Sequence, residues 1–155
     1  MEIVGFSARH AEDFRRLNEI WILQHFQLEE KDRRQLLDPH GEIIEPGGFI
    51  FVAEHEGAMV GCCAMLRMED GGFELVKMTV AEDVRGQGVG RMLIDACLDR
   101  AKEEGASRLY LETNSKLSPA LHLYRAMGFE DCEPRQSEYE RCDVWMERRF
   151  TPDTP

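Results

Sequence analysis

Three glycines alternate in residues 85–90, which read R-G-Q-G-V-G. Because glycine has no Cβ, the backbone here can turn tightly and bring several N–H groups to face one point. A β-rich stretch precedes these residues and a run with helical apolar spacing follows them, so the partial positive charge of a helix N-terminus lies at the same place. The pattern is typical of a loop that binds a diphosphate, the alternative being a glycine-rich turn without a ligand. The candidate loop residues are Arg85, Gly86, Gln87, Gly88, Val89, Gly90 and Arg91.

Two common phosphate-binding loops do not fit this segment. A Walker A loop ends in Gly-Lys-Ser/Thr, and that ending is missing here. A dinucleotide fingerprint needs Gly-x-Gly-x-x-Gly, and its third glycine, counted from Gly86, would fall on Arg91. Glu112 does follow at the distance where a carboxylate binds a ribose, so a nucleotide-binding domain of another type stays open as an alternative.

The apolar pattern around the loop alternates between strand and helix periodicity. We expect helices over residues 9–27, 29–37, 88–104 and 118–127, with Ser7 as the first N-cap and Gly105 and Gly128 ending the last two. We expect strands over residues 2–6, 49–54, 59–67, 73–80, 108–112, 129–133 and 142–148. Residues 38–41, with a proline and a glycine, break the pattern after the second helix. This order predicts an α/β fold in which a mixed sheet lies between helices.

The length of 155 residues fits one domain over residues 1–150, followed by a disordered tail over residues 151–155 with two prolines. Nineteen basic and thirty acidic side chains give a formal net charge of −11. This excess of acidic side chains argues against nucleic-acid binding, which needs a basic surface. An acidic surface favours a cationic small molecule or protein tail as partner, although ordinary solvated charge has the same signature.

Cysteine and histidine spacing gives no metal signature. The five cysteines are odd in number and have no Cys-x-x-Cys spacing, which argues against a disulfide framework or a zinc knuckle and favours a reducing compartment. The five histidines are scattered, without a His-Glu-x-x-His pair. No apolar run approaches the ~18 residues of a membrane span, and the N-terminus has no signal-peptide pattern. We therefore expect a cytoplasmic protein without a metal site or a membrane anchor.

Two motifs in register resemble the GNAT superfamily of N-acetyltransferases. The family's loop is Arg/Gln-x-x-Gly-x-Gly/Ala, which Arg85, Gly88 and Gly90 meet after the approach M-T-V-A-E-D-V. The later L-H-L-Y-R-A-M-G-F resembles the second signature, centred on Tyr124. The resemblance covers residues 49–133. The stretches F-E-L-V-K-M-T-V and S-E-Y-E-R-C-D-V-W-M-E resemble a bacterial subgroup of unassigned substrate and extend it to nearly the whole chain.

The resemblance implies a splayed, mixed central sheet of six to seven strands with about four helices on both faces. Acetyl-coenzyme A (acetyl-CoA) would lie in the V between the fourth and fifth strands, with its pyrophosphate on the loop. Backbone groups of Met78, Thr79 and Val80 would pair with the pantetheine arm, as in β-strand addition. The implied activity is transfer of the acetyl group to a primary amine of a small molecule or protein by direct attack.

The resemblance also implies roles for three catalytic groups. The backbone N–H of Val80 matches the donor to the oxyanion. Tyr124 matches the acid that protonates the departing thiolate; the alternative is a core aromatic in its helix. Glu74 lies where some members of the family have a base, and burial would raise its pKa. The alternatives are a surface glutamate at a strand edge and a water that carries the proton.

One position departs from the family's pattern. The family often has Asn seven residues before the tyrosine, and this chain has Leu117 there. We expect Asn114 to replace that contact with the cofactor. The departure motivates a second hypothesis, a non-catalytic acyl-CoA-binding sensor or interaction module. The resemblance also suggests a homodimer.

The residues that bind the acceptor amine are harder to identify. Tyr139, Arg141 and Asp143 are candidates for the substrate pocket because side chains of both signs cluster there; the alternative is cross-strand surface pairs, which we favour for Asp143. On the first helix, packing is the expected role of three further residues, and walling the acceptor cleft is the alternative. These residues are Trp21, His25 and Phe26.

Overall fold

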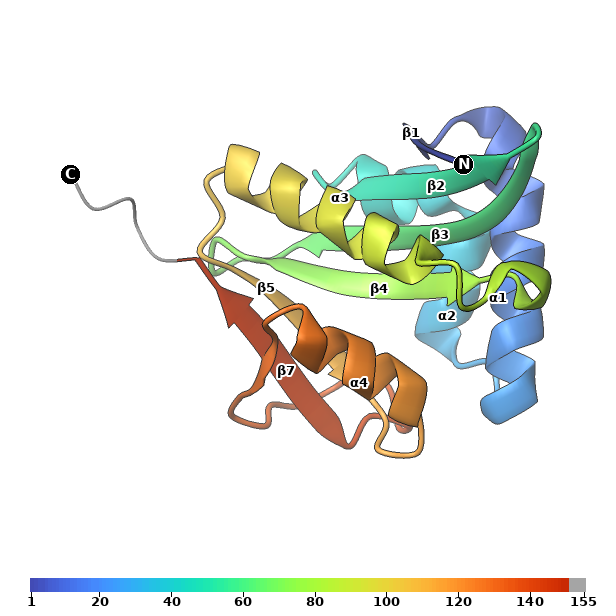
Figure 1. Ribbon diagram of the computed structural model, residues 1–155. Helices are drawn as coiled ribbons and strands as arrows, with labels where there is room; N and C mark the ends of the chain where they lie inside the picture. Colours follow the sequence, from blue (N-terminus) through green and yellow to red (C-terminus); the bar gives the residue numbers. More distant parts are fainter. Residues whose placement is uncertain (151–155) are drawn as a thin grey trace.

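A computed structural model describes residues 1–150, in which seven strands form one sheet with helices on both faces (Figure 1). The predicted disordered tail, residues 151–155, lies outside the described residues. The helices are η1 (Ala8–His10), α1 (Ala11–His25), α2 (Glu30–Leu37), η2 (His40–Ile44), η3 (Glu82–Val84), α3 (Val89–Glu103) and α4 (Ser118–Ala126). The strands are β1 (Glu2–Gly5), β2 (Phe49–His55), β3 (Ala58–Arg67), β4 (Phe73–Val80), β5 (Arg108–Thr113), β6 (Glu130–Asp131) and β7 (Val144–Arg149).

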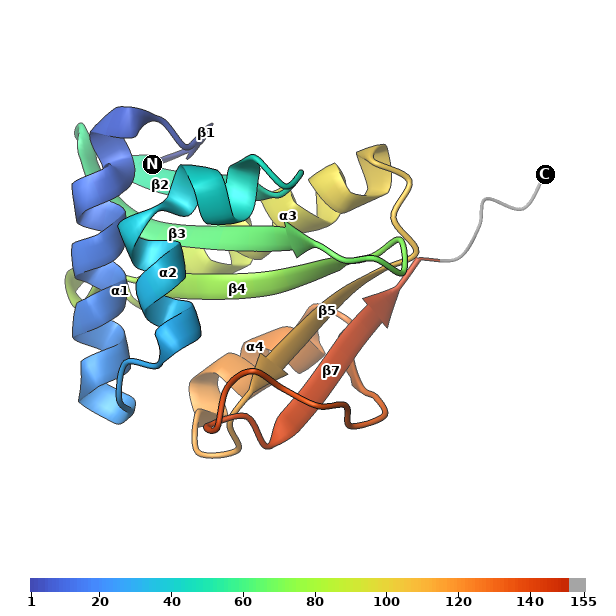
Figure 2. The same cartoon turned by 180° about the vertical axis from the view of Figure 1, so that it is seen from behind.

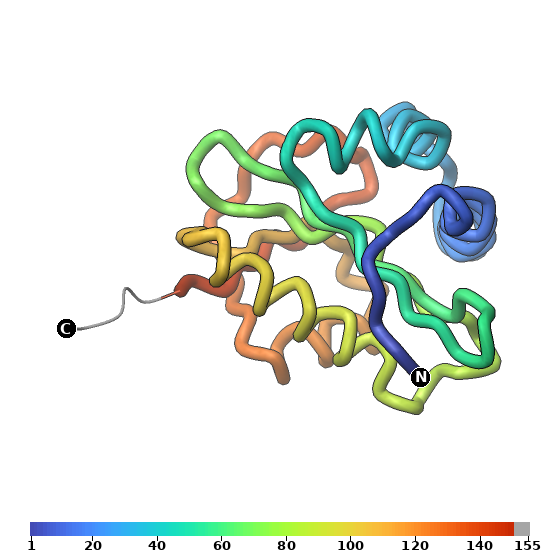
Figure 3. The backbone as a smooth tube through the Cα atoms, turned by 90° about the horizontal axis from the view of Figure 1, so that it is seen from above, coloured from blue at the N-terminus to red at the C-terminus, as the bar shows by residue number. Residues whose placement is uncertain are grey.

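The sheet has the order β1-β2-β3-β4-β5-β7-β6, and β4 pairs in parallel with β5 while the other neighbours are antiparallel. Helices α1 and α2 cover one face and α3 and α4 the other, as the front, back and top views agree (Figures 1, 2 and 3). Strand residues alternate between two apolar layers. One layer holds Phe14 and Ile22 of α1, and the other holds Leu93 and Cys97 of α3. The predicted α/β fold with a mixed sheet is confirmed.

Two stretches differ from the sequence-based expectation. Residues 38–41 were expected only to break the pattern after the second helix. Instead, the Asp38 carboxylate accepts a hydrogen bond from the N–H of Gly41 (3.0 Å), and the π-helix η2 starts at His40. Near the C-terminus, β6 has only two residues and β7 begins at Val144. Residues 132–143 form a loop that is held by side chains instead of a ladder, for example by the indole of Trp145, which donates to the carbonyl of Arg135 (2.9 Å).

The splay of the sheet begins in the middle of β4. Strands β4 and β5 pair only through Phe73, Glu74 and Leu75, which face residues 109–111. Beyond Leu75 the two strands diverge, so residues 76–80 have no strand beside them on that side. This is the V that the sequence comparison implied, and it leaves backbone N–H and C=O groups facing an opening.

A β-bulge sits beside the V. Val76 pairs with Ala64 and Thr79 with Cys62, so two residues of β4, Lys77 and Met78, stand where β3 has one. Lys77 has a φ of +53°, in the left-handed region that side chains with a Cβ rarely adopt. In a regular strand residues 76 and 79 would point to opposite faces. The extra residue puts both on the face covered by α1.

The Lys77 side chain ends on a buried carboxylate. Its Nζ donates to Asp32 Oδ1 (2.7 Å), while Arg141 donates to both oxygens of Asp32 (2.6 and 2.8 Å) and the N–H of Glu29 donates to Oδ2 (3.0 Å). Asp32 is 0% exposed. Burial alone would raise the pKa of Asp32, but the hydrogen bonds from Arg141 and the charge of Lys77 outweigh it and hold the pKa well below its usual range. One carboxylate therefore joins α2, the bulge and the loop before β7.

The substitution Asp32→Asn should remove about 3 kcal/mol from the free energy of unfolding, because it leaves the Lys77 and Arg141 cations buried beside a neutral amide. Denaturant unfolding measures the change. As a control, Asp13→Asn breaks an exposed pair with Arg16 and should cost less than about 1 kcal/mol. Equal losses in the two variants would contradict the role given to Asp32.

The effect of Asp32 should depend on pH in one direction. A lowered pKa means that the contribution is fully present above the unfolded pKa of about 3.9 and is lost as pH falls toward the folded value. The stability difference between the wild type and Asp32→Asn should thus be constant between about pH 5 and 7 and shrink on acidification below about pH 4. A difference that grows in acid would contradict the sign.

Candidate active site

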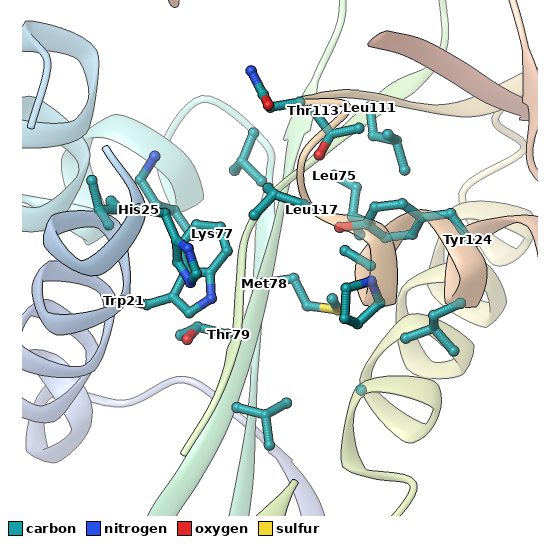
Figure 4. Close-up of a pocket in the computed structure, with 18 of the residues that line it drawn as sticks. Trp21, His25, Leu75, Lys77, Met78, Thr79, Leu111, Thr113, Leu117 and Tyr124 are labelled. Atoms are coloured by element: carbon teal, nitrogen blue, oxygen red, sulfur yellow. The ribbon is translucent and has the colours of Figure 1, made fainter. Parts of the chain in front are cut away.

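A cavity of about 630 Å³ fills the V between β4 and β5 (Figure 4). Its walls come from α1 on one face of the sheet and from the start of α3 and from α4 on the other. The cavity therefore passes through the sheet, and molecules that approach from opposite faces can meet inside it. In Figure 4, Trp21, His25, Lys77 and Thr79 lie on the α1 side of β4, and Tyr124 lies on the α4 side.

The glycine loop forms one end of the cavity. Gly86 and Gly88 have φ values of +82° and +80°, which a residue with a Cβ adopts only with strain. The first hydrogen bond of α3 runs from the N–H of Met92 to the carbonyl of Gly88 (3.1 Å). The N–H groups of residues 88–91 consequently have no acceptor within the helix, and together with the positive end of the helix they suit an anion.

The other loop residues divide by position. Arg85 and Arg91 line the cavity with the glycines and Val89, whereas the exposed Gln87 lies outside it. The Nε of Arg85 donates to the carbonyl of Val80 (3.3 Å). The third glycine, Gly90, has a packing reason, since a Cβ there would lie 3.1 Å from Leu123 of α4.

The ladder decides which backbone groups of β4 face the cavity. The N–H of Ala81 donates to the carbonyl of Val60 (2.8 Å), and Val80 pairs with Gly61. Val80 is thus at a non-hydrogen-bonded position, and its N–H and C=O point away from β3 into the V. Thr79 occupies the next hydrogen-bonded position, so its backbone turns toward β3 and its side chain lines the cavity instead. That placement differs from the expectation that the Thr79 backbone faces a cofactor.

Tyr124 lies on α4 with its ring against Phe129 (centroids 5.9 Å apart) and its hydroxyl toward the cavity (Figure 4). The hydroxyl has no hydrogen-bond partner among residues 1–150. Burial, with a smaller contribution from the neighbouring Cys63, raises the pKa of Tyr124 well above its ordinary value. A core aromatic would explain the ring, but not a hydroxyl at a cavity wall.

Glu74 is buried at the narrow end of the V. Its side chain is 12% exposed and its nearest cation is Lys31, whose Nζ lies 3.7 Å from the carboxylate. Burial raises the pKa of Glu74; Lys31 lowers it, and the charge of Glu112 raises it further. The alternative of a surface glutamate at a strand edge is therefore wrong.

Asn114 lines the cavity, but protein groups already occupy its amide. Its Nδ2 donates to the carbonyl of Arg141 (2.7 Å), and its Oδ1 accepts from the N–H of Lys116 (2.9 Å). Leu117 also lines the cavity, at the N-cap of α4. Asn114 thus fixes the loop that carries Arg141, whatever contact it makes with a bound molecule.

The C-terminal candidates separate into two kinds. Tyr139 and Arg141 line the cavity, and the Tyr139 hydroxyl accepts a hydrogen bond from Lys77 Nζ (3.0 Å). Asp143 instead accepts from the N–H and hydroxyl of Ser115 (2.7 and 2.8 Å), which is a structural role. None of the three lies in a strand, so the alternative of cross-strand pairs is wrong for them.

The aromatic residues near the end of α1, Trp21, His25 and Phe26, line the cavity. This was the alternative to the packing role expected for them. The Trp21 and His25 ring centroids lie 5.1 Å apart. Lys116 places its Nζ 4.2 Å from the centre of the Phe26 ring and donates to the carbonyl of His25 (2.7 Å). These contacts tie the end of α1 to the loop before α4.

The sequence did not identify Asp32 and Lys77 as part of the site. It predicted that the backbone of Thr79 faces the cavity, whereas in the structure the side chain does. A lysine within the apolar run of β4 was the available signal, because a charge in a central strand needs a buried partner. Within residues 1–150, no group of three or more metal-binding side chains is present, and all five cysteines are unpaired. No helix in the same part of the chain has both the length and the apolar character needed to cross a membrane.

Comparison with known proteins assigns the chain to a family. Residues 12–129 match the acetyltransferase (GNAT) family. An "IAA acetyltransferase" of Azospirillum brasilense is 36% identical over 93 residues, which are 59% of this chain and 61% of that protein, so the chain spans less than two thirds of this relative. A GNAT acetyltransferase structure from Staphylococcus aureus Mu50 has a TM-score of 0.89 at 19% identity and covers 97% of this chain and 99% of its own. An aminoglycoside 6′-N-acetyltransferase with coenzyme A bound has a TM-score of 0.77 at 14% identity over 100% of both chains. The chain belongs to the GNAT family of acetyltransferases.

Proposed function

We propose that the chain is an N-acetyltransferase that uses acetyl-CoA and acetylates a primary amine by direct attack. The observation that carries the proposal is one cavity that connects an anion-binding helix N-terminus with Tyr124 and Glu74. The similar fold of a coenzyme A complex supports the choice of donor. The acceptor belongs to a small molecule or a protein.

The cofactor would lie along the open edge of β4. The N–H groups of residues 88–91 would bind the pyrophosphate, with Arg85 and Arg91 beside it. The pantetheine amides would add to the unpaired edge of β4 as an extra strand, using the backbone of Val80 and of Met78 in the bulge. Asn114 would act by holding the cavity wall.

Spacing along β4 favours Met78 over Val80 as the oxyanion donor. At about 3.3 Å per residue, Glu74 lies roughly 20 Å from Val80 but about 13 Å from Met78. Tyr124 lies beside Cys63, which faces the bulge at Lys77 and Met78. The hydroxyl and the bulge therefore stand at the same level of the V. We place the reacting carbonyl there, with Val80 binding the pantetheine.

The reaction follows from these positions. The lone pair of the neutral amine attacks the thioester carbon, and the carbonyl electrons move to oxygen, where the Met78 N–H stabilises the oxyanion. The amine loses a proton to Glu74, through water given the distance along β4. The C–S bond then breaks and the thiolate takes a proton from Tyr124. A raised pKa keeps the phenol protonated until negative charge develops on sulfur.

The loop geometry predicts a cofactor-specific loss for Gly88→Ala. A Cβ there meets open space, so strain at a φ of +80° and displacement of the N–H groups are the only effects. We expect acetyl-CoA to bind about 10-fold more weakly by calorimetry, in line with a strain of 1–2 kcal/mol. Gly105→Ala is the matched control, since Gly105 also has a positive φ (+72°) and open space but lies at the far end of α3. Equal weakening by both variants would contradict the anion-binding role.

Tyr124→Phe should lower kcat by roughly 100-fold or more, with little change in acetyl-CoA affinity, since only the departing thiolate needs the proton. Thiol release from acetyl-CoA across an amine panel measures kcat. Thermal unfolding should be nearly unchanged, because the hydroxyl has no partner among residues 1–150. Unchanged turnover would remove Tyr124 as the acid. No turnover by the wild type with any amine, despite tight acetyl-CoA binding, would favour the sensor hypothesis that Leu117 motivates.

Glu74→Gln should lower kcat/KM by roughly 100-fold and make the acidic limb of its pH profile less steep, because only the titration of the amine itself then remains. A base must be deprotonated, so wild-type activity should fall as pH falls through the raised pKa of Glu74. Glu112→Gln is the control: it removes a charge that raises this pKa, so the limb should move to lower pH and persist. An acidic limb of unchanged steepness in Glu74→Gln would assign proton removal to water alone.

A further inference from the structure

One buried hydroxyl in the cavity has no protein partner. Thr79 is 3% exposed, and among residues 1–150 its Oγ1 is the buried side-chain oxygen or nitrogen without a hydrogen bond. Native structures rarely leave such an atom unsatisfied, because its desolvation is not compensated. The side chain lines the cavity, so a molecule bound there lies against Thr79.

The bulge delivers this hydroxyl to the acceptor side. Thr79 pairs with Cys62, whose sulfur contacts Asn18 of α1 (3.4 Å), and cross-strand partners point to the same face. Tyr124 approaches from the opposite face (Figure 4). Thr79 follows Met78 directly, so its hydroxyl stands beside the reacting carbonyl, on the side from which the amine arrives.

Trp21 and His25 line the cavity on the same side of β4 as Thr79, with ring centroids 5.1 Å apart and ring planes tilted by 51° (Figure 4). The Phe26 ring already carries the ammonium of Lys116 and the guanidinium of Arg141. In the described part of the chain no Lys or Arg lies over the Trp21 ring, which has His25 and Phe26 as aromatic neighbours at centroid distances of 5.1 and 6.4 Å. A partly exposed indole at a cavity wall suits a flat apolar group.

The charges around Glu74 favour an ammonium over a carboxylate. Asp32 already holds Lys77 and Arg141, which limits their attraction for an anion. Lys31 is the nearest cation to the Glu74 carboxylate, at 3.7 Å, and Lys77 and Arg135 act on it from farther away. A carboxylate on the acceptor would meet Glu74 with the same sign.

We infer that Thr79 and Trp21 form the acceptor site, and that the acceptor is a primary alkyl amine that carries an aromatic ring and no carboxylate. The Trp21 indole stacks on the ring. A neutral primary amine has two N–H groups: one proton leaves toward Glu74 and water, and the other N–H donates to Thr79 Oγ1, which aims the lone pair at the thioester carbon. Thr79 is thus a positioning residue, and the inference rests on the proposed function.

Thr79→Val tests the hydrogen bond with phenethylamine and N-methylphenethylamine as matched probes. The secondary amine has one N–H, which it gives up in the reaction, so it cannot use Thr79. We expect kcat/KM to fall about 10-fold for phenethylamine and less than about 2-fold for the N-methyl amine, as loss of one hydrogen bond predicts. Thr79→Ser keeps the hydroxyl and should restore the primary amine. Equal losses for both probes, or none for either, would overturn the role of Thr79.

Two further measurements exclude a merely structural effect. Removing an unsatisfied buried hydroxyl should raise Tm of Thr79→Val by about 2–4 °C, and acetyl-CoA affinity measured by calorimetry should not change. A lower Tm together with weaker acetyl-CoA binding would mean that Thr79 supports the fold, and would overturn the inference.

Trp21→Ala tests whether the site recognises the aromatic ring of the acceptor, with phenethylamine, hexylamine and phenylalanine as probes. The wild type should prefer phenethylamine to hexylamine by about 2- to 10-fold, Trp21→Ala should remove that preference, and Trp21→Phe should keep most of it. Leu23→Ala, at an exposed residue of α1 outside the cavity, should leave the preference unchanged. Phenylalanine should be the poorest probe. Equal use of all three amines would overturn the acceptor class and leave the acetyltransferase intact, whereas failure to bind acetyl-CoA would defeat the proposed function itself.

Discussion

Asp32 receives hydrogen bonds from the backbone of Glu29, from Lys77 and from Arg141, and through them it holds three separate segments together. The left-handed backbone of Lys77 costs roughly 1–2 kcal/mol, and the charge-assisted bond to Asp32 offsets that strain. The same carboxylate also draws the loop with Arg141 over the bulge. Apolar side chains of similar volume could give equal stability, as buried ion pairs often show. Apolar side chains could not hold Lys77 in place in the bulge, so the main effect of the ion cluster is to fix the geometry of β4.

The bulge and the splay together create the site. Pairing between β4 and β5 stops at Leu75, and residues 76–80 then present backbone groups to the V. A sheet interior that is left unpaired is costly unless another chain or a ligand supplies partners. Pantetheine has two amides that can do so. The contact between Lys116 and the carbonyl of His25 joins the opposite walls, which keeps the V at a fixed width.

The sequence was enough to predict a donor site at the glycine loop. Glycines at 86 and 88 need positive φ, and that need is local, so it is visible without a structure. Glu74 and Tyr124 were predicted from the resemblance to the GNAT family. Asp32 was not found, because it lies on a helix whose other residues are mostly polar and which therefore resembles a solvated surface helix. The bulge was not found either, since the segment that contains Lys77 has the period of a regular strand. The Asp32 cluster depends on a contact across 45 residues, between residues 32 and 77, and the bulge depends on the pairing of β4 with β3.

The direction in which successive β4 side chains point explains why the sequence predicts a donor site but not an acceptor site. In the proposed function, backbone N–H groups and a helix N-terminus would hold the donor, and no side-chain substitution removes them short of breaking the loop. Side chains of α1 and β4 would face the acceptor, and each can change without moving the donor. The extra residue in the bulge turns Thr79 to the α1 face while Met78 stays on the α4 face. Deleting one residue here would exchange the two faces from Thr79 onward. Acceptor recognition therefore depends on the bulge, a feature of pairing between strands that the residue types alone do not specify.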